Sequence, residues 1–307
     1  MRYFRPSILK MSNQFDIPTP KNFSFIHTVT GHGWSALLPF EYDGTTGTLD
    51  YVFRGPHSGK PVSVSIREEG KIIRLESASK KKADREEILQ AVGHILRFDD
   101  DLDDFYVTVG KEETLAWAER LNAGRLLRSN TVFEDLVKTM CTTNCSWALT
   151  KNMTANLVGK LGEAAADGKL AFPTPETLAS VSEDFFRSEI RAGYRSPYFV
   201  ELAETVAGGK LDPEAWLVSE LPTAELKKEI KKVKGIGDYA AENLLKLLGR
   251  YDGLALDSWL RAGFYKKHNR EKVCPDKKIE KHYGKFGKWK GLAMWCDMTR
   301  ERFDENV

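Results

Sequence analysis

Hydrophobic and polar positions alternate along the first part of the chain. In VSVSIR the apolar residues Val62, Val64 and Ile66 are separated by polar ones, and TLDYVFR (48–54) follows the same pattern. A period of two is typical of a strand with one buried face. Glycine-containing turns such as YDGTTG and EEGK separate these segments. We therefore expect residues 20–76 to form antiparallel strands with one face exposed to water.

From Asp84 onward the apolar residues recur at helical spacing. In DREEILQAVGHILRF, Ile88, Val92 and Ile95 are three or four positions apart, and acidic residues occupy the first turn. The acidic run DDDLDDF (99–105) lacks the glycine and terminal glutamate of a calcium loop, so it is expected to be a solvated loop and helix cap. Further helices are predicted over 112–127, 131–150, 152–168, 175–180, 182–192, 196–207, 223–234, 238–248, 258–266 and 288–302.

The predicted fold class is α+β: a small N-terminal antiparallel β-sheet followed by a large, mostly α-helical body. We expect a sheet domain with a following helix over 1–105 and the helical body over 106–307. The 307 residues are 41% hydrophobic and 29% charged, which is ordinary for a soluble globular protein. A formal net charge of +2 does not by itself indicate a nucleic-acid or membrane partner, so any basic surface must be local. No apolar run approaches the roughly 18 residues of a membrane span, and a monomeric, intracellular protein is expected.

The four cysteines do not have the pattern of a metal or redox site. Cys141, Cys145, Cys274 and Cys296 lack CxxC spacing and the clustered thiolates of an iron–sulfur cluster. Cys141 and Cys145, at i and i+4, have the spacing to share a metal, but plain buried thiols are far commoner. We therefore expect reduced thiols, no metal and no iron–sulfur cluster.

Two helices joined by a tight turn are predicted at 223–248, around the sequence VKGIGDYAAENLLKLLG. Gly235 and Gly237 permit torsions that side chains forbid, and Ile236 is expected to fill the interface between the helices. The second helix then begins with free backbone N–H groups, which suit a phosphate, and Lys234 adds positive charge just before it. A plain hairpin with a solvated lysine face is the alternative interpretation.

Asp257 follows twenty positions after Gly237, where the next helix is expected to begin. Backbone N–H donors and the helix dipole favour an ionised carboxylate at a helix N-terminus. Cleavage of an N-glycosidic bond develops positive charge on the sugar, so a fixed anion is the group that this reaction needs. The same carboxylate could activate the attacking water. A role as a helix cap alone is also compatible with the pattern.

The order of hairpin, short apolar stretch and aspartate resembles the helix-hairpin-helix superfamily of DNA glycosylases. The 8-oxoguanine DNA glycosylase family looks closest, over roughly residues 20–302 and most clearly over 124–262. The resemblance implies an enzyme that flips a damaged base out of double-stranded DNA and breaks its N-glycosidic bond, with Asp257 as the catalytic carboxylate. It implies no cofactor, except that a monovalent cation at the hairpin turn remains an alternative.

Further residues are assigned by their positions in the segments that resemble this family, CTTNCS and AGYRSPYF. The resemblance implies that Asn144 and Arg195 read the orphan base and that Tyr194 fills the gap in the base stack. The alternative for Asn144 is an amide hydrogen-bonded within its helix. The alternative for Arg195 is a surface ion pair, and for Tyr194 a place in the core. Trp295 falls near the family's stacking aromatic, where a core tryptophan is equally expected. Leu149 replaces a second arginine that the family uses on the orphan cytosine, which weakens the cytosine assignment.

One departure from the family bears on the reaction. Lytic members carry a lysine two residues after the second hairpin glycine, and this chain has Tyr239 there, in which it is similar to the monofunctional alkylpurine glycosylases. Water is then the expected nucleophile and an abasic site the product, while Tyr239 is expected to line the base pocket and stack on the flipped base. The predicted function is hydrolytic excision of an oxidised or alkylated purine in base-excision repair. A catalytically silent damage-binding protein and a lyase using another lysine, with Lys234 as the first suspect, are the alternatives.

Overall fold

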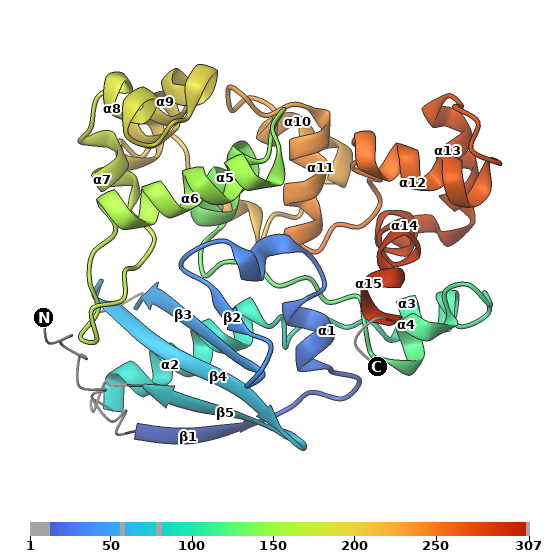
Figure 1. The fold of residues 1–307 in the computed structure, drawn as a ribbon, viewed down its shortest axis with the longest axis horizontal. Coiled ribbons are helices and arrows are strands. Elements are labelled where there is room, and N and C mark those ends of the chain that lie inside the picture. Colours follow the sequence, from blue (N-terminus) through green and yellow to red (C-terminus); the bar gives the residue numbers. More distant parts are fainter. Residues whose placement is uncertain (1–12, 56–58, 78–81, 305–307) are drawn as a thin grey trace, which may run out of the picture.

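The computed structural model describes residues 13–55, 59–77 and 82–304. Its N-terminal part is an antiparallel sheet in which the strands of the described residues follow the order β1-β5-β4-β3-β2 (Figure 1). The strands are β1 (Asn13–Pro18), β2 (Glu41–Asp43), β3 (Thr48–Arg54), β4 (Pro61–Glu69) and β5 (Ile72–Ser77).

The alternating segments form strands β3 and β4, as predicted, and these two strands are neighbours in the sheet. Their apolar residues are buried and oppose one another across the β3–β4 ladder, as Leu49 with Ile66, Tyr51 with Val64, and Phe53 with Val62. Neighbouring side chains on one face of a ladder pack against each other, so this register places the core on one side of the sheet.

The prediction that strands extend over 20–76 is wrong at its start. A short helix, α1 (Phe25–Val29), begins after Ser24, whose hydroxyl accepts a hydrogen bond from the backbone N–H of His27. A 3-10 turn (Gly33–Ala36) follows it. The first strand, β1, lies before the predicted segment and pairs with β5. A serine N-cap six residues after the end of β1 was the local signal for this helix.

Helices make up most of the remaining chain, and the α+β class is confirmed. They are α2 (Lys82–Ile95), α3 (Asp103–Val109), α4 (Ala116–Arg120), α5 (Val132–Cys141), α6 (Trp147–Leu161), α7 (Pro175–Ala179), α8 (Glu183–Ser188), α9 (Ser196–Ala207), α10 (Thr223–Ile230), α11 (Asp238–Leu247), α12 (Ser258–His268), α13 (Asp276–Tyr283), α14 (Lys290–Thr299) and α15 (Glu301–Asp304).

The helix predicted over 131–150 is interrupted between α5 and α6. The hydroxyls of Thr142 and Thr143 donate to the carbonyls of Thr139 and Met140, which competes with the helical hydrogen bonds. Asn144 then takes a positive φ of 45°. This break turns the chain and places the residues after α5 beside the cavity described below.

The helix predicted over 112–127 is also largely absent. Only α4 is helical there, because the chain leaves the helix at Asn122, with φ of 50°, and at Gly124, with φ of 115°. Extended chain follows and carries the buried side chains of Arg125 and Arg128. In the acidic run, helix α3 begins at Asp103.

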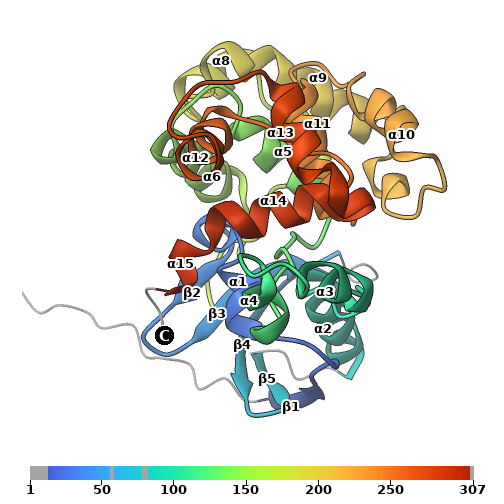
Figure 2. The same ribbon diagram turned by 90° about the vertical axis from the view of Figure 1, so that its right-hand side faces the viewer.

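The buried apolar residues form two main cores that do not follow the order of the chain. One core contains the inner face of the sheet, helices α2–α4 and side chains of α12–α15. The other contains side chains between Val132 and Leu248, from helices α5–α11. The C-terminal helices therefore return to the N-terminal part, and Figure 2 shows α14 lying between the sheet and the rest of the helical body.

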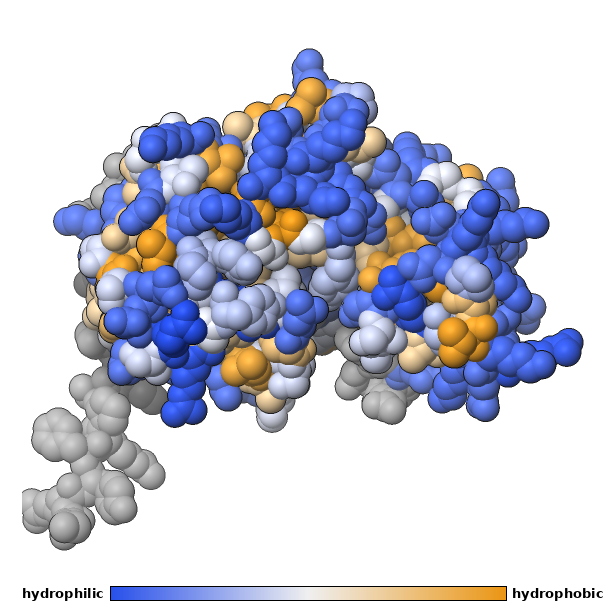
Figure 3. Space-filling view, turned by 90° about the horizontal axis from the view of Figure 1, so that it is seen from above, coloured by the Kyte–Doolittle hydropathy of each residue, from blue (hydrophilic) through white to orange (hydrophobic). Residues whose placement is uncertain are grey.

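The face seen in Figure 3 is mostly hydrophilic, with small, separate apolar patches. Among the helices of the described ranges, none is both long enough and apolar enough to cross a bilayer.

Candidate active site

The hairpin turn between α10 and α11 contains two glycines, Gly235 and Gly237. A side chain at Gly235 would strain the backbone and clash with a neighbour, whereas a side chain at Gly237 would do neither. Gly235 has a φ of 85°, and a Cβ added to it would lie 2.6 Å from the ring of Tyr198. Ile236 is buried in the helix interface, as predicted. Helix α10 ends at Ile230 rather than at 234, so a longer turn than predicted precedes α11.

Helix α11 begins at this turn without a side-chain cap. Gly237 is its N-cap residue and offers no side-chain acceptor. The backbone N–H groups of the first turn therefore remain available to an external anion. The nearest positive charges are partly occupied, because Lys227 and Lys231 pair with the exposed carboxylate of Asp238 at 3.0 and 3.1 Å.

Lys234 lies on the outer surface of the hairpin. Its side chain is 64% exposed, and its ammonium pairs with Glu201 of α9 at 2.7 Å. It does not line the cavity that contains Asp257. This exposed position suits a contact with a DNA phosphate. The DNA-binding role of Lys234 stays a prediction.

We expect Gly237→Val to weaken binding to undamaged duplex DNA without unfolding the protein. A Cβ at this residue meets nothing within 4 Å, and its φ of −89° is open to any residue. The branched side chain would instead fill the space in front of the free N–H groups. The slope of log affinity against log salt should fall by about 1, the loss of roughly one phosphate contact.

The matched control is Gly159→Val, on an exposed position of α6 where an added Cβ also meets nothing within 4 Å. Fluorescence anisotropy over a salt series, with thermal unfolding of both variants, gives the comparison. Unchanged DNA binding by the Gly237 variant would remove the hairpin from the interface.

Asp257 occupies the N-cap position of α12. Its Oδ1 accepts a hydrogen bond from the backbone N–H of Leu260 at 2.7 Å, so the predicted cap is confirmed. The side chain is only half-buried, and the residue also lines a cavity of about 460 Å³. One carboxylate oxygen can therefore serve the helix while the other faces the cavity, and the two interpretations made from the sequence are compatible.

Tyr239 lies in the first turn of α11 and lines the same cavity. Burial raises the pKa of its phenol to about 12, and the nearby negative charge of Asp257 acts in the same direction. The phenol therefore keeps its proton throughout the neutral range. Asn243, one turn further along α11, also lines the cavity.

The cavity wall is strongly aromatic. The volume of the cavity is typical of a site for a small organic ligand. Besides Tyr239, the wall contains Trp34, Trp147, Trp259 and Trp295. Flat aromatic side chains offer stacking surfaces to any base.

Trp295 of α14 is one of these wall residues, and its predicted contact with a base stays a prediction. Its indole N–H donates to the carbonyl oxygen of Gly31 at 2.8 Å, and its ring centroid lies 6.1 Å from that of Trp259. Gly33 permits the close approach of Trp147, because a Cβ on Gly33 would lie 2.6 Å from the ring of that tryptophan. The segment that contains Gly31 and Gly33 thus contacts two of the tryptophans.

Two polar side chains that sequence reasoning missed also line the cavity, His32 and Lys246. Lys246 is buried, with 3% of its surface exposed, and His32 is half-buried. Burial, together with the positive charges of Arg97 and Lys246, lowers the pKa of His32 to about 4, so the imidazole is neutral. The only sequence signal for Lys246 was its place on one helical face with Tyr239 and Asn243, at spacings of four and three.

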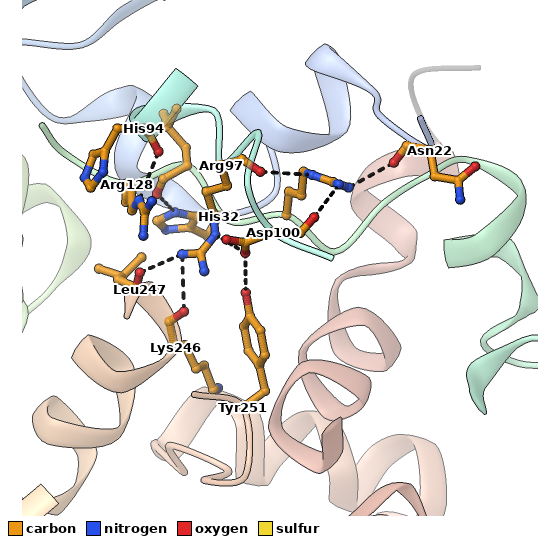
Figure 4. Close-up of polar contacts among 11 residues, drawn as sticks. Asn22, His32, His94, Arg97, Asp100, Arg128, Lys246, Leu247 and Tyr251 are labelled. Atoms are coloured by element: carbon orange, nitrogen blue, oxygen red, sulfur yellow. Dashed lines mark hydrogen bonds and ion pairs between the residues drawn. The ribbon is translucent and has the colours of Figure 1, made fainter. Parts of the chain in front are cut away.

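Behind the cavity, a polar network joins the end of α11 to the N-terminal part (Figure 4). The guanidinium of Arg97 donates to the carbonyl oxygen of Leu247 at 2.6 Å and to the carboxylate of Asp100 at 2.6 Å. The hydroxyl of Tyr251 donates to the same carboxylate at 3.3 Å. A cation at the C-terminus of a helix is favoured by the helix dipole, so this network fixes the helix that carries Tyr239 and Lys246.

The predicted orphan-base residues come together at one place, outside the cavity. The amide of Asn144 donates to the hydroxyl of Tyr194 at 3.2 Å, and the guanidinium of Arg195 lies 4.6 Å from the Tyr194 ring centroid. Tyr194 is 50% exposed, whereas Arg195 is buried and donates to Thr143 and to the carbonyl of Ala192. Arg195 thus supports the exposed tyrosine, and its reading of a base remains a prediction.

One group of possible metal ligands occurs among the described residues, formed by His268, His282 and Asp297. The carboxylate of Asp297 already pairs with the ammonium of Lys267 at 2.6 Å and accepts from the hydroxyl of Tyr283 at 2.6 Å. An ammonium in contact with the carboxylate opposes a cation there, so we interpret the group as an ion-pair network joining α12, α13 and α14.

Comparison with known proteins agrees with this geometry. No family model matches the chain. By sequence it is similar to an inferred DNA-3-methyladenine glycosylase of Bacillus subtilis, YfjP, at 23% identity over 173 residues, which are 55% of this chain and 58% of that protein. It is also similar to an inferred N-glycosylase/DNA lyase of Methanothermobacter thermautotrophicus, at 22% identity over 227 residues, which are 66% of this chain and 70% of that protein. The match to the Bacillus relative thus spans less than two thirds of its length.

The similarity in structure covers almost the whole chain. MBOgg1, in complex with a low-affinity DNA ligand, has a TM-score of 0.76 at 18% identity and covers 96% of this chain and 97% of its own. The 3-methyladenine DNA glycosylase of Archaeoglobus fulgidus has a TM-score of 0.75 at 19% identity, with 95% and 100% covered. The 8-oxoguanine glycosylase/lyase of Clostridium acetobutylicum has a TM-score of 0.73 at 19% identity, with 93% and 95% covered. The chain has the fold of the helix-hairpin-helix DNA glycosylases, and the resemblance seen in the sequence is confirmed at the level of the fold.

Proposed function

We propose that the protein is a monofunctional DNA glycosylase that flips a damaged purine, oxidised or alkylated, out of double-stranded DNA and hydrolyses its N-glycosidic bond. The observation that carries the proposal is the carboxylate of Asp257 at the wall of an aromatic cavity, with Tyr239 beside it and the hairpin turn next to Tyr239 in the chain. A protein that only bound DNA would gain nothing from an anion facing a polyanion.

In the proposed reaction the hairpin N–H groups bind a backbone phosphate and the flipped base enters the cavity. The negative charge of Asp257 stabilises the positive charge that develops on the sugar as the bond breaks, and its free oxygen orients or deprotonates the attacking water. Tyr239 stacks on the base and contributes no amine. The product is an abasic site in an intact strand.

We further propose that the protein acts as a monomer on damaged duplex DNA and needs no resident cofactor. A monovalent cation at the hairpin turn remains the one alternative from the sequence. The function is tested by measuring single-turnover base release from duplexes that contain 8-oxoguanine, hypoxanthine or 7-methylguanine opposite each of the four normal bases. Each product is analysed with and without alkali, which cleaves the strand at an abasic site. No release from any duplex would favour the damage-binding alternative.

Tyr194 is proposed to enter the base stack when the damaged base leaves it. We expect Tyr194→Ala to lower base release by about 10- to 100-fold, because one stacking contact contributes roughly 1–3 kcal/mol. Tyr194→Phe, which keeps the ring, should retain most of the rate. Because the side chain is half exposed, the Ala variant should remain folded. Flipping is measured from 2-aminopurine fluorescence next to the lesion.

The orphan-base assignment predicts faster release opposite cytosine than opposite the other bases. Arg195→Ala should reduce this preference, although its burial makes a thermal unfolding control necessary. Equal wild-type rates opposite all four bases would count against the assignment.

A further inference from the structure

Lys246 is a buried ammonium in the wall of the base cavity. Its Nζ donates to the carbonyl oxygen of Leu254 at 3.1 Å and lies 5.7 Å from the ring centroid of Trp295. Within the described residues, Leu254 provides the one hydrogen-bond acceptor that this ammonium has. An ammonium carries three N–H donors, so donors remain for a ligand in the cavity.

No carboxylate in the described part of the chain forms an ion pair with Lys246. The nearest candidate on its own helix, Glu242, is engaged elsewhere: it pairs with Lys227 at 2.6 Å and accepts from the backbone N–H of Ala255 at 2.6 Å. Burying a charge without a partner is costly in a purely structural role. A bound acceptor would recover part of that cost.

The position of Lys246 along α11 places it toward the base rather than toward the sugar. It is seven residues beyond Tyr239, about 10 Å further along the helix axis. Asp257 acts near Tyr239, where the proposed reaction breaks the bond to the sugar. The neutral imidazole of His32 lines the same cavity, and its surroundings are positively charged.

We propose that Lys246 is a specificity-determining residue that donates a hydrogen bond to a neutral base and excludes permanently cationic bases. The proposal rests on the glycosylase function proposed above and narrows its substrate class. Aromatic walls accept neutral and cationic damaged purines alike, and their π-faces favour the cationic ones. A fixed ammonium in the wall reverses that preference, because like charges repel strongly in a site with little water. A carbonyl oxygen or unmethylated ring nitrogen on a neutral purine satisfies the donor instead.

The charge of Lys246 also gives the proposal a pH signature. Burial lowers the pKa of its ammonium to about 8, while nearby negative groups oppose the shift. Lys246 interacts electrostatically with titratable groups from several elements. These groups are Glu242, Asp257, Cys296 and His32. Release of a neutral base should fall as pH rises through about 8, where the ammonium loses its proton, and a variant without the ammonium should lack this step.

The test compares the wild-type protein with Lys246→Met and Lys246→Gln. Met keeps the length of the side chain without a donor or a charge, and Gln keeps a donor without the charge. Single-turnover release is measured from duplexes containing neutral 8-oxoguanine or cationic 7-methylguanine opposite cytosine, corrected for spontaneous loss. For Met, the ratio of the 8-oxoguanine rate to the 7-methylguanine rate should fall about 10- to 100-fold. For Gln, the fall should be smaller.

Thermal unfolding and affinity for undamaged duplex establish that both variants are folded; replacing an unpaired buried charge by an isostere is expected to preserve stability. Equal loss of both rates in folded Met and Gln variants would overturn the assignment and leave the glycosylase function standing. A wild-type preference for 7-methylguanine would do the same. If the wild-type protein released no base from any duplex, the proposed function itself would fall.

Discussion

Asp257→Asn is expected to reduce base release by at least about 10²- to 10³-fold while leaving the fold and the affinity for lesion DNA nearly intact. The substitution removes the negative charge that the reaction needs and keeps the shape of the side chain. Asparagine is also a good N-cap residue, so its amide oxygen can still accept from the backbone N–H of Leu260. The experiment therefore separates the charge from the cap.

Asp257→Ala is the matched control, because it removes both charge and cap. It should lose base release to the same extent and in addition about 1 kcal/mol of unfolding free energy, the usual contribution of an N-cap. Single-turnover kinetics and denaturant unfolding measure the two effects. If the Asn variant kept most of its rate, Asp257 would be a helix cap without a catalytic role.

No covalent protein–DNA adduct is expected when the wild-type protein turns over in the presence of borohydride, and the product strand should stay intact until treated with alkali. A Schiff base needs an amine within reach of the sugar, and beside Asp257 the cavity presents the phenol of Tyr239. Lys234 lies outside this cavity in a surface ion pair, and Lys246 lies about 10 Å further along α11.

Tyr239→Lys provides the positive control for this experiment. It places an amine beside Asp257 and should produce a trapped adduct and weak strand cleavage, provided that the aspartate acts on the sugar. An adduct with the wild-type protein would contradict the monofunctional proposal. Repeating the trap with Lys234→Gln and Lys246→Gln would then identify the amine responsible.

The sequence alone was sufficient for elements whose local pattern met no competing local interaction. The period-two pattern located β3 and β4, and the hairpin and the cap followed from short-range torsional and hydrogen-bonding requirements at Gly235 and Asp257. The predicted helices failed where local hydrogen bonds or backbone torsions compete with the helix, because hydrophobic periodicity does not reveal such competition. Threonine hydroxyls bonded to Thr139 and Met140 ended α5 early, and Gly124 turned a predicted helix into extended chain.

The cavity, in contrast, was decided only by the tertiary structure. Its wall is assembled from segments far apart in the chain, such as Trp34 in the N-terminal loop, Trp147 on α6 and Trp295 on α14. Each of these residues alone has the pattern of an ordinary core aromatic. Lys246 likewise appears in the sequence as one more lysine of a lysine-rich region, and only the packing of α11 against the N-terminal part buries it. Burial then sets the charge and the pKa of a side chain, so the chemistry of the base site depends on contacts that the sequence pattern does not contain.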